Sequence, residues 1–190
     1  MSDLASPHSE AYATDMATAR LSPDLWLTAG LAALQHDGPA ALGAEPLARA
    51  LKTTKGSFYW HFKDVPAFHA AVLAHWRTLA VASLAKTTQS ALPPDQALRQ
   101  FGRDLLADPV EPRLRSWAQN DPGVATVLAT VDTARLDHLR HLLADLGFGN
   151  QSFAHALQAA LIGLPQLAPT DTAQQQASFD TLIDTVLALS

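Results

Sequence analysis

Apolar residues recur along most of the chain with the three- to four-residue period of helices, and no stretch alternates convincingly as a strand would. The first helix is expected to begin at Ser22 and Pro23, a hydroxyl N-cap followed by proline at the first helical position. It is expected to end before Gly38, because glycine commonly terminates helices. Its apolar stripe is Leu27, Leu31 and Leu34. The fold class is therefore predicted to be all-α.

Short polar residues mark where later helices begin. Thr54, Asp64 and Asp121 each precede a predicted helix, where their side chains accept hydrogen bonds from first-turn N–H groups. Helices are expected at about 44–51, 55–62, 95–107, 111–119, 122–146, 151–164 and 171–189, with a long one after Asp64. The stripe of that long helix is Phe68, Val72, Trp76 and Leu79. Pro165 and Pro169 are expected to separate the last two helices.

These elements divide the chain into three parts. Residues 1–20 mix Ser, Ala, Thr and Asp without apolar periodicity and are expected to form a flexible N-terminal tail. Residues 21–66 hold three short helices, and 67–190 hold a larger helical body. Three short helices followed by a long one are typical of a helix-turn-helix domain, in which the third helix enters the major groove of DNA.

Charge supports this interpretation of the third helix. The chain has a net charge of −5, yet residues 47–63 contain four basic residues and no Asp or Glu. Net charge is a poor guide when only a small face contacts the partner, so the local excess matters more. Gly56 would let the backbone approach DNA, Lys55 suits a base edge or phosphate, and Lys63 suits a phosphate.

The motifs GPAAL at 38–42, LARAL at 47–51 and TKGSFYWHFKD at 54–64 resemble the TetR family DNA-binding domain. The resemblance covers about residues 21–68, a quarter of the chain. It implies a DNA face made of Thr54, Lys55, Gly56, Ser57, Tyr59, Trp60, His61 and Lys63. It places Phe58 and Phe62 in the core. For Trp60, the alternative is that it braces the fourth helix. Arg49 is either a phosphate contact or a solvated surface charge.

Four positions depart from the family pattern. Gly43 stands where a Thr or Ser N-cap is usual, and Thr53 where a core valine is usual. Lys52 replaces the usual turn glycine and is expected to adopt a positive φ, at a cost on the order of 1 kcal/mol. Val65 stands where a phosphate-binding lysine is common. These departures lower the DNA affinity that we expect.

The helical body offers candidate ligand contacts. They are Phe101, Trp117, His138, His141 and Phe153. The alternative for the aromatic residues is ordinary core packing, and for the histidines a surface position. A metal or acid/base site on the Asp- and His-rich segment 137–145 is a weaker alternative, because no HExxH or comparable ligand set is present. No metal or cofactor is expected.

The last two helices carry more apolar residues than one amphipathic stripe needs. These residues are Leu157, Leu161, Leu182, Ile183, Val186 and Leu187. A second buried face would form if the helices met their copies in a four-helix bundle across a two-fold axis. The family resemblance implies the same homodimer and a ligand-binding and dimerisation role for the body.

The chain has no cysteine, no signal peptide pattern and no apolar stretch long enough to span a membrane, so a cytoplasmic location is expected. The expected function is a ligand-responsive repressor that binds a palindromic operator in double-stranded DNA as a homodimer and responds to a small-molecule effector. The first alternative is a helical interaction module that kept the scaffold without DNA binding. The second is a metal-dependent enzyme that uses the helix at 137–145.

Overall fold

The computed structural model describes residues 22–89, 91–167 and 171–188, and these residues form helices with no strand among them. The all-α prediction is therefore confirmed for this part of the chain. The expected tail at 1–20 lies outside the described residues.

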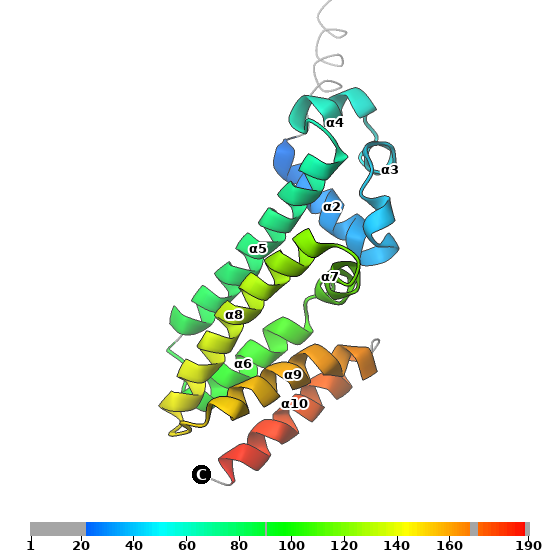
Figure 1. Cartoon of the computed structure of the whole chain (residues 1–190). Helices are drawn as coiled ribbons and strands as arrows, with labels where there is room; N and C mark the ends of the chain where they lie inside the picture. The colour runs from blue at the N-terminus through cyan, green and yellow to red at the C-terminus, as the bar shows by residue number, and fades with distance from the viewer. Residues whose placement is uncertain (1–21, 90, 168–170, 189–190) are drawn as a thin grey trace, which may run out of the picture.

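The N-terminal helices form a compact head at one end of a long helix (Figure 1). The elements of the head are α2 (Pro23–Asp37), the 3-10 helix η2 (Pro39–Ala41), α3 (Ala44–Ala50) and α4 (Lys55–His61). The long helix is α5 (Val65–Gln89). The head follows the predicted order of three short helices and a long one; the 3-10 turn was not anticipated.

The buried face of α2 is shifted by one position from most of the expected stripe. Trp26 and Leu34 are fully buried, whereas Leu27 and Leu31 are only partly buried. The large Trp26 ring occupies the centre of the interface and packs edge-on against Phe58, with ring centroids 5.4 Å apart. The expectation centred on leucines was wrong because it left out this indole ring.

Side-chain caps hold the helix starts as predicted. The Ser22 hydroxyl accepts from the Leu25 N–H at 3.4 Å, and the Thr54 hydroxyl accepts from the Ser57 N–H at 3.3 Å. A carboxylate oxygen of Asp64 accepts from the backbone N–H of residue 67 at 2.8 Å. These bonds satisfy N–H groups that have no partner inside the helix.

Five helices form the body beside and below α5 (Figure 1). They are α6 (Pro94–Leu106), α7 (Glu111–Ala118), α8 (Pro122–Asp145), α9 (Gln151–Leu167) and α10 (Thr172–Leu187). Helix α8 runs along α5, while α9 and α10 lie together at the end of the molecule away from the head. No helix among the described residues is both long and apolar enough to cross a membrane.

Two details of the body depart from the expectations. Helix α9 continues through Pro165 instead of ending at Leu164, because it ends only two residues later and the missing N–H affects its last turn alone. In α5, Leu79 is 50% exposed and Ala80 is buried in its place. A 3.6-residue period allows either position to follow Trp76, and the small alanine permits closer packing.

The buried apolar residues form two clusters. The first joins the head to the N-terminal half of α5, to α7 and to the start of α8. The second joins α6, the end of α8, α9 and α10, and Leu84 of α5 packs against it. Helix α5 thus contributes to both clusters. The division into parts at 21–66 and 67–190 stays a prediction.

Candidate nucleic-acid interface

Helix α4 is held in place by the side chain that points inward. Phe58 is fully buried, and its ring lies 5.4 Å from Trp26, 5.3 Å from Phe62 and 5.1 Å from Phe68. Edge-to-face ring pairs at such distances add to the free energy gained by burying the rings. The aromatic cluster therefore sets how α4 is presented to solvent.

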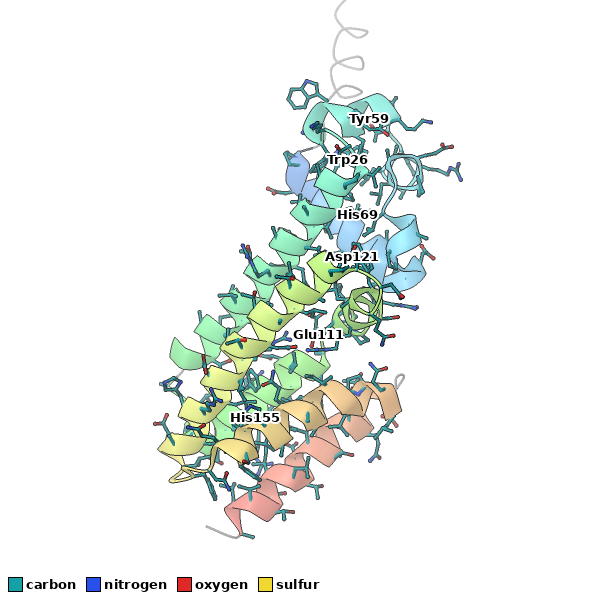
Figure 2. The ribbon with its side chains drawn as sticks, viewed as in Figure 1. Trp26, Tyr59, His69, Glu111, Asp121 and His155 are labelled. Atoms are coloured by element: carbon teal, nitrogen blue, oxygen red, sulfur yellow. The ribbon has the colours of Figure 1, made fainter. Side chains whose placement is uncertain are left out.

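The opposite side of α4 is open to solvent at the tip of the head, where Figure 2 shows Tyr59. Tyr59 is 53% exposed and Trp60 is 62% exposed. Large aromatic side chains are seldom left so exposed without a partner surface. Among the described residues, a Cβ added at Gly56 would meet only the Thr54 hydroxyl, at 3.6 Å, so these residues leave room for another molecule to approach the backbone there.

The remaining predicted contact residues divide by exposure. Lys63 and Arg49 are exposed, whereas Ser57 and His61 are half-buried. The His61 ring packs edge-on against Trp60 with centroids 4.7 Å apart, and its Nε2 has no hydrogen-bond partner among the described residues. All nine predicted residues thus lie on α4 or on segments next to it, and their role in DNA contact stays a prediction.

An acidic residue outside the basic window engages two of its cations. One Glu45 carboxylate oxygen lies 3.4 Å from Arg49 Nη2, and the other lies 3.3 Å from Lys55 Nζ. All three side chains are at least 59% exposed, so these pairs stabilise the fold little. Sequence reasoning missed Glu45 because it lies just before the window at 47–63, although its i,i+4 spacing to Arg49 was a visible signal.

The turn between α3 and α4 confirms the expectation for Lys52, which has a φ of 52°. The Lys52 N–H donates to the Arg49 carbonyl at 3.2 Å, and the Thr53 N–H donates to the Ala48 carbonyl at 2.9 Å. These bonds hold the left-handed residue in place. At two other departures, Gly43 begins α3 without a side-chain cap, and Val65 packs against the core of the head.

Comparisons with known proteins agree with this geometry. Residues 27–64 match the family model described as "Bacterial regulatory proteins, tetR family". The chain therefore carries a TetR-family domain. The match covers most of the head, from within α2 to the end of α4, and it confirms the resemblance inferred from the motifs. No curated protein matches the sequence.

Solved structures extend the likeness of fold beyond the TetR-family domain. A TetR-family transcriptional regulator from Streptomyces coelicolor superimposes with a TM-score of 0.74 at 16% identity, covering 98% of this chain and 96% of the other. A transcriptional regulator from Rhodococcus sp. Rha1 has a TM-score of 0.74 at 18% identity, with 88% and 97% covered. The described part of the chain therefore shares its fold with these transcriptional regulators.

The structure brings only some of the five candidate ligand contacts together. His138 and His141 line a cavity of about 660 Å³ between α5, α6 and α8. The Phe101 ring lies behind them in the core, 5.4 Å from the His138 ring. Trp117 packs instead against His69 near the head, and Phe153 packs against Phe148.

Burial lowers the pKa of His138 below its usual value, and the neighbouring His141 adds to the effect. The His138 ring is therefore neutral at pH 7. No group of three or more His, Cys, Asp or Glu side chains suited to a metal ion occurs in the part of the chain that the structure describes.

A buried ionic network lies inside the body, between α7 and α8, at the level of Glu111 in Figure 2. Glu111 pairs with Arg115 at 2.6 Å and with Arg135 at 2.7 Å, and Asp132 pairs with Arg115 at 2.7 Å. Burial opposes the charge on Arg115, but the carboxylates of Asp132 and Glu111 outweigh it and raise the pKa of Arg115. Sequence reasoning missed this network because the pairs Arg115–Asp132 and Arg135–Glu111 join two helices whose packing the sequence does not show, and its i,i+3 and i,i+4 pairs have the spacing of ordinary surface pairs.

Helix α7 also contacts the head directly. Arg113 donates from Nε to the Gln35 carbonyl at 3.2 Å and from an Nη to the His36 carbonyl at 3.5 Å, at the C-terminal end of α2. His69 on α5 donates from Nε2 to the Leu42 carbonyl at 3.2 Å and packs against Trp117 of α7. A shift of α7 would therefore change contacts of the head.

Proposed function

We propose that the protein is a ligand-responsive repressor that binds a palindromic operator as a homodimer in the cytoplasm. Residues 21–66 would bind DNA, and residues 67–190 would bind the effector and form the dimer. The observation that carries the proposal is the outward face of α4, where Tyr59 and Trp60 are exposed on a helix anchored from behind by Phe58. The TetR-family match over the same residues supports it.

The contacts with bases and phosphates follow from this arrangement. Tyr59 and His61 carry hydrogen-bonding groups that suit base edges, and Lys55 and Lys63 suit base edges or phosphates. Arg49 on α3 extends the basic surface toward the phosphate backbone. Thr54, Gly56, Ser57 and Trp60 complete the proposed DNA face.

The effector is proposed to bind in the cavity lined by His138 and His141. A ligand that favours one arrangement of α5, α6 and α8 would shift the population between head positions, so that ligand and DNA oppose each other through linkage. The contacts of α7 with the head give this shift a physical route.

The dimer is proposed to form through α9 and α10. Leu157, Leu161, Ile183 and Val186 are already buried within the chain's own bundle, so the partner would cover the outward faces, including the 41% exposed Leu182. Light scattering coupled to size exclusion should give twice the mass of the chain. Leu182→Asp should shift the protein toward monomer, and a wild-type mass equal to one chain would contradict the dimer.

The DNA-binding test is fluorescence anisotropy on duplexes that tile the DNA beside the protein's own gene, with scrambled duplexes as controls. We expect specific binding that weakens steeply as salt rises, because bound Lys and Arg release counterions from phosphates. Lys55→Ala with Tyr59→Ala should abolish specific binding, whereas Lys86→Ala, which removes a cation from α5 far from the head, should not. Equal binding of tiled and scrambled duplexes would refute the proposal.

A further inference from the structure

The effector cavity has a chemical character of its own. It lies between α5, α6 and α8, toward the ends of α5 and α8 that are farthest from the head (Figure 1). Its volume of about 660 Å³ is in the range of ordinary small-molecule sites. Its lining divides into an apolar wall and a polar edge, and the two together restrict what can bind.

The apolar wall comes mainly from α5, with one residue each from α6, from α8 and from the segment before α6. It consists of Val81, Leu84, Ala85, Leu92, Ala97 and Leu142. Val81 is 47% exposed and Leu92 is 42% exposed, so two large apolar side chains of this wall are left in contact with water. A hydrocarbon group that covered them would gain free energy in proportion to the apolar area it removed from water.

The polar edge comes from α8 and is dominated by hydrogen-bond acceptors. Asp137 and Asp145 line it with carboxylates, which only accept when ionised. His141 Nδ1 lies 2.7 Å from the backbone carbonyl of Asp137 and must carry the hydrogen there, because a carbonyl oxygen only accepts.

No Lys or Arg is among the described residues that line the cavity. Asp137 pairs with Arg140 at 2.8 Å, from outside the lining. The Arg140 side chain is 36% exposed and that of Asp137 is 54% exposed. Such an exposed pair is weak and leaves Asp137 able to accept a second donor. Asp145 has no hydrogen-bond or ion-pair partner among the described residues. The edge is therefore negative and rich in acceptors.

We propose that the effector is an amphipathic amine that binds in its protonated form. Its ammonium group donates to Asp137 and Asp145, and its hydrocarbon part lies on the wall that contains Val81 and Leu92. The proposal rests on the proposed function, since it names the class of ligand for the same cavity. An anionic ligand is disfavoured because it would meet two carboxylates and no cation.

The test uses three probes with one carbon skeleton: 4,4-diphenylbutylamine, 4,4-diphenylbutan-1-ol and 4,4-diphenylbutanoate. Isothermal titration calorimetry of the full chain without DNA measures each affinity at pH 7. We expect the amine to bind about tenfold more tightly than the alcohol, which corresponds to one well-placed charged contact. The carboxylate should bind more weakly than the alcohol. An alcohol or carboxylate that bound as tightly as the amine would overturn the proposal.

Variants test whether the two carboxylates cause the preference for the amine. Asp145→Asn and Asp137→Asn should each weaken amine binding several-fold and leave alcohol binding unchanged. Asp24→Asn, which removes the same charge from an exposed position on α2, is the matched control and should change neither. Ala85→Trp should block all three probes, because Ala85 is exposed at the wall and its replacement fills the cavity without disturbing the core. Unchanged amine affinity in both Asn variants, or in Ala85→Trp, would contradict the proposal.

The same amine is then added to the complex with operator DNA. Release of DNA would support both the ligand class and the proposed function. Retained DNA, with the amine preference intact in calorimetry, would support the ligand class and count against ligand-responsive repression. Because calorimetry is done without DNA, a protein that binds no DNA still gives a decisive result for the amine.

Discussion

The head and the distal part of the body are packed in different ways. Behind α4, four aromatic rings fill the head, and Trp26 and Phe58 are completely buried. The distal body instead leaves a cavity of about 660 Å³ and large apolar side chains such as Val81 in solvent. Dense packing holds a helix in one position, whereas sparse packing lets neighbouring helices shift at little cost. The comparison indicates a rigid head and an adaptable distal body.

The largest effect is expected in the buried ionic network between α7 and α8. Arg135→Met should lower the free energy of unfolding by about 3–5 kcal/mol, because it leaves the Glu111 carboxylate buried without one of its partners. Urea denaturation measures this loss. The double variant with Glu111→Leu should be less destabilised than Arg135→Met alone, since no buried charge is then uncompensated and Asp132 still pairs with Arg115. A double variant that lost more stability than the single one would show that the lost packing, and not the uncompensated charge, determines the free energy of unfolding in this network.

Within the head, the tightness of packing can be tested at Gly30. A Cβ there would lie 2.8 Å from the Phe68 ring and 2.9 Å from a methyl group of Val72. Gly30→Ala should therefore destabilise the protein by about 1–3 kcal/mol through overpacking. Gly163→Ala is the matched control in the body, because no atom lies within 4 Å of its added Cβ, and alanine there should be neutral or stabilising. Thermal unfolding of both variants checks the difference; equal shifts would remove the contrast between the regions.

A stabilising change is expected in the turn of the head. Lys52→Gly should raise the free energy of unfolding by about 1 kcal/mol, because glycine adopts a φ of 52° without strain. Lys86→Gly, in the helical part of α5, should have the opposite sign. The two variants lose the same charge, so their difference in urea denaturation isolates the backbone effect. A Lys52→Gly protein no more stable than wild type would show that the turn is unstrained.

The smallest effect is expected on the DNA face itself. Glu45→Gln should strengthen DNA binding by about threefold at low salt, because Arg49 and Lys55 are no longer held by a carboxylate that competes with phosphate. Stability should hardly change, since the pairs are exposed. Anisotropy at several salt concentrations measures the gain, which should shrink as salt rises. Weaker binding in the variant would mean that Glu45 positions these cations for DNA.

The elements of the head could be predicted well from sequence because their signals are local. Thr54 is an N-cap as predicted, and Lys52 has the positive φ expected of a residue at a glycine position. Errors arose where the burial of a residue depends on tertiary packing. Leu79 has the right spacing for the buried face of α5, but the packing of the bundle selects Ala80.

The candidate sites were predicted unevenly for the same reason. One contiguous motif carries most of the proposed DNA face, so these residues could be named together. The cavity is assembled from three helices, and periodicity alone could not show that His138 and His141 line it while Trp117 packs near the head. Nor could it show that Glu111 and Arg135 meet inside the protein, because their partners are set by how α7 lies against α8.

Helix α5 passes from the cavity to the head without a break, and this gives it the geometry of a lever. Leu84 lines the cavity, and Phe68 lies in the aromatic core of the head, about 24 Å away along the helix at 1.5 Å per residue. A tilt of about 5° about the cavity end would move Phe68 by about 2 Å over such an arm. The close contact of Gly30 with Phe68 and Val72 means that α2 must travel with it. A small displacement of α5 at the cavity, one that leaves the cavity walls intact, thus becomes a larger displacement at α4.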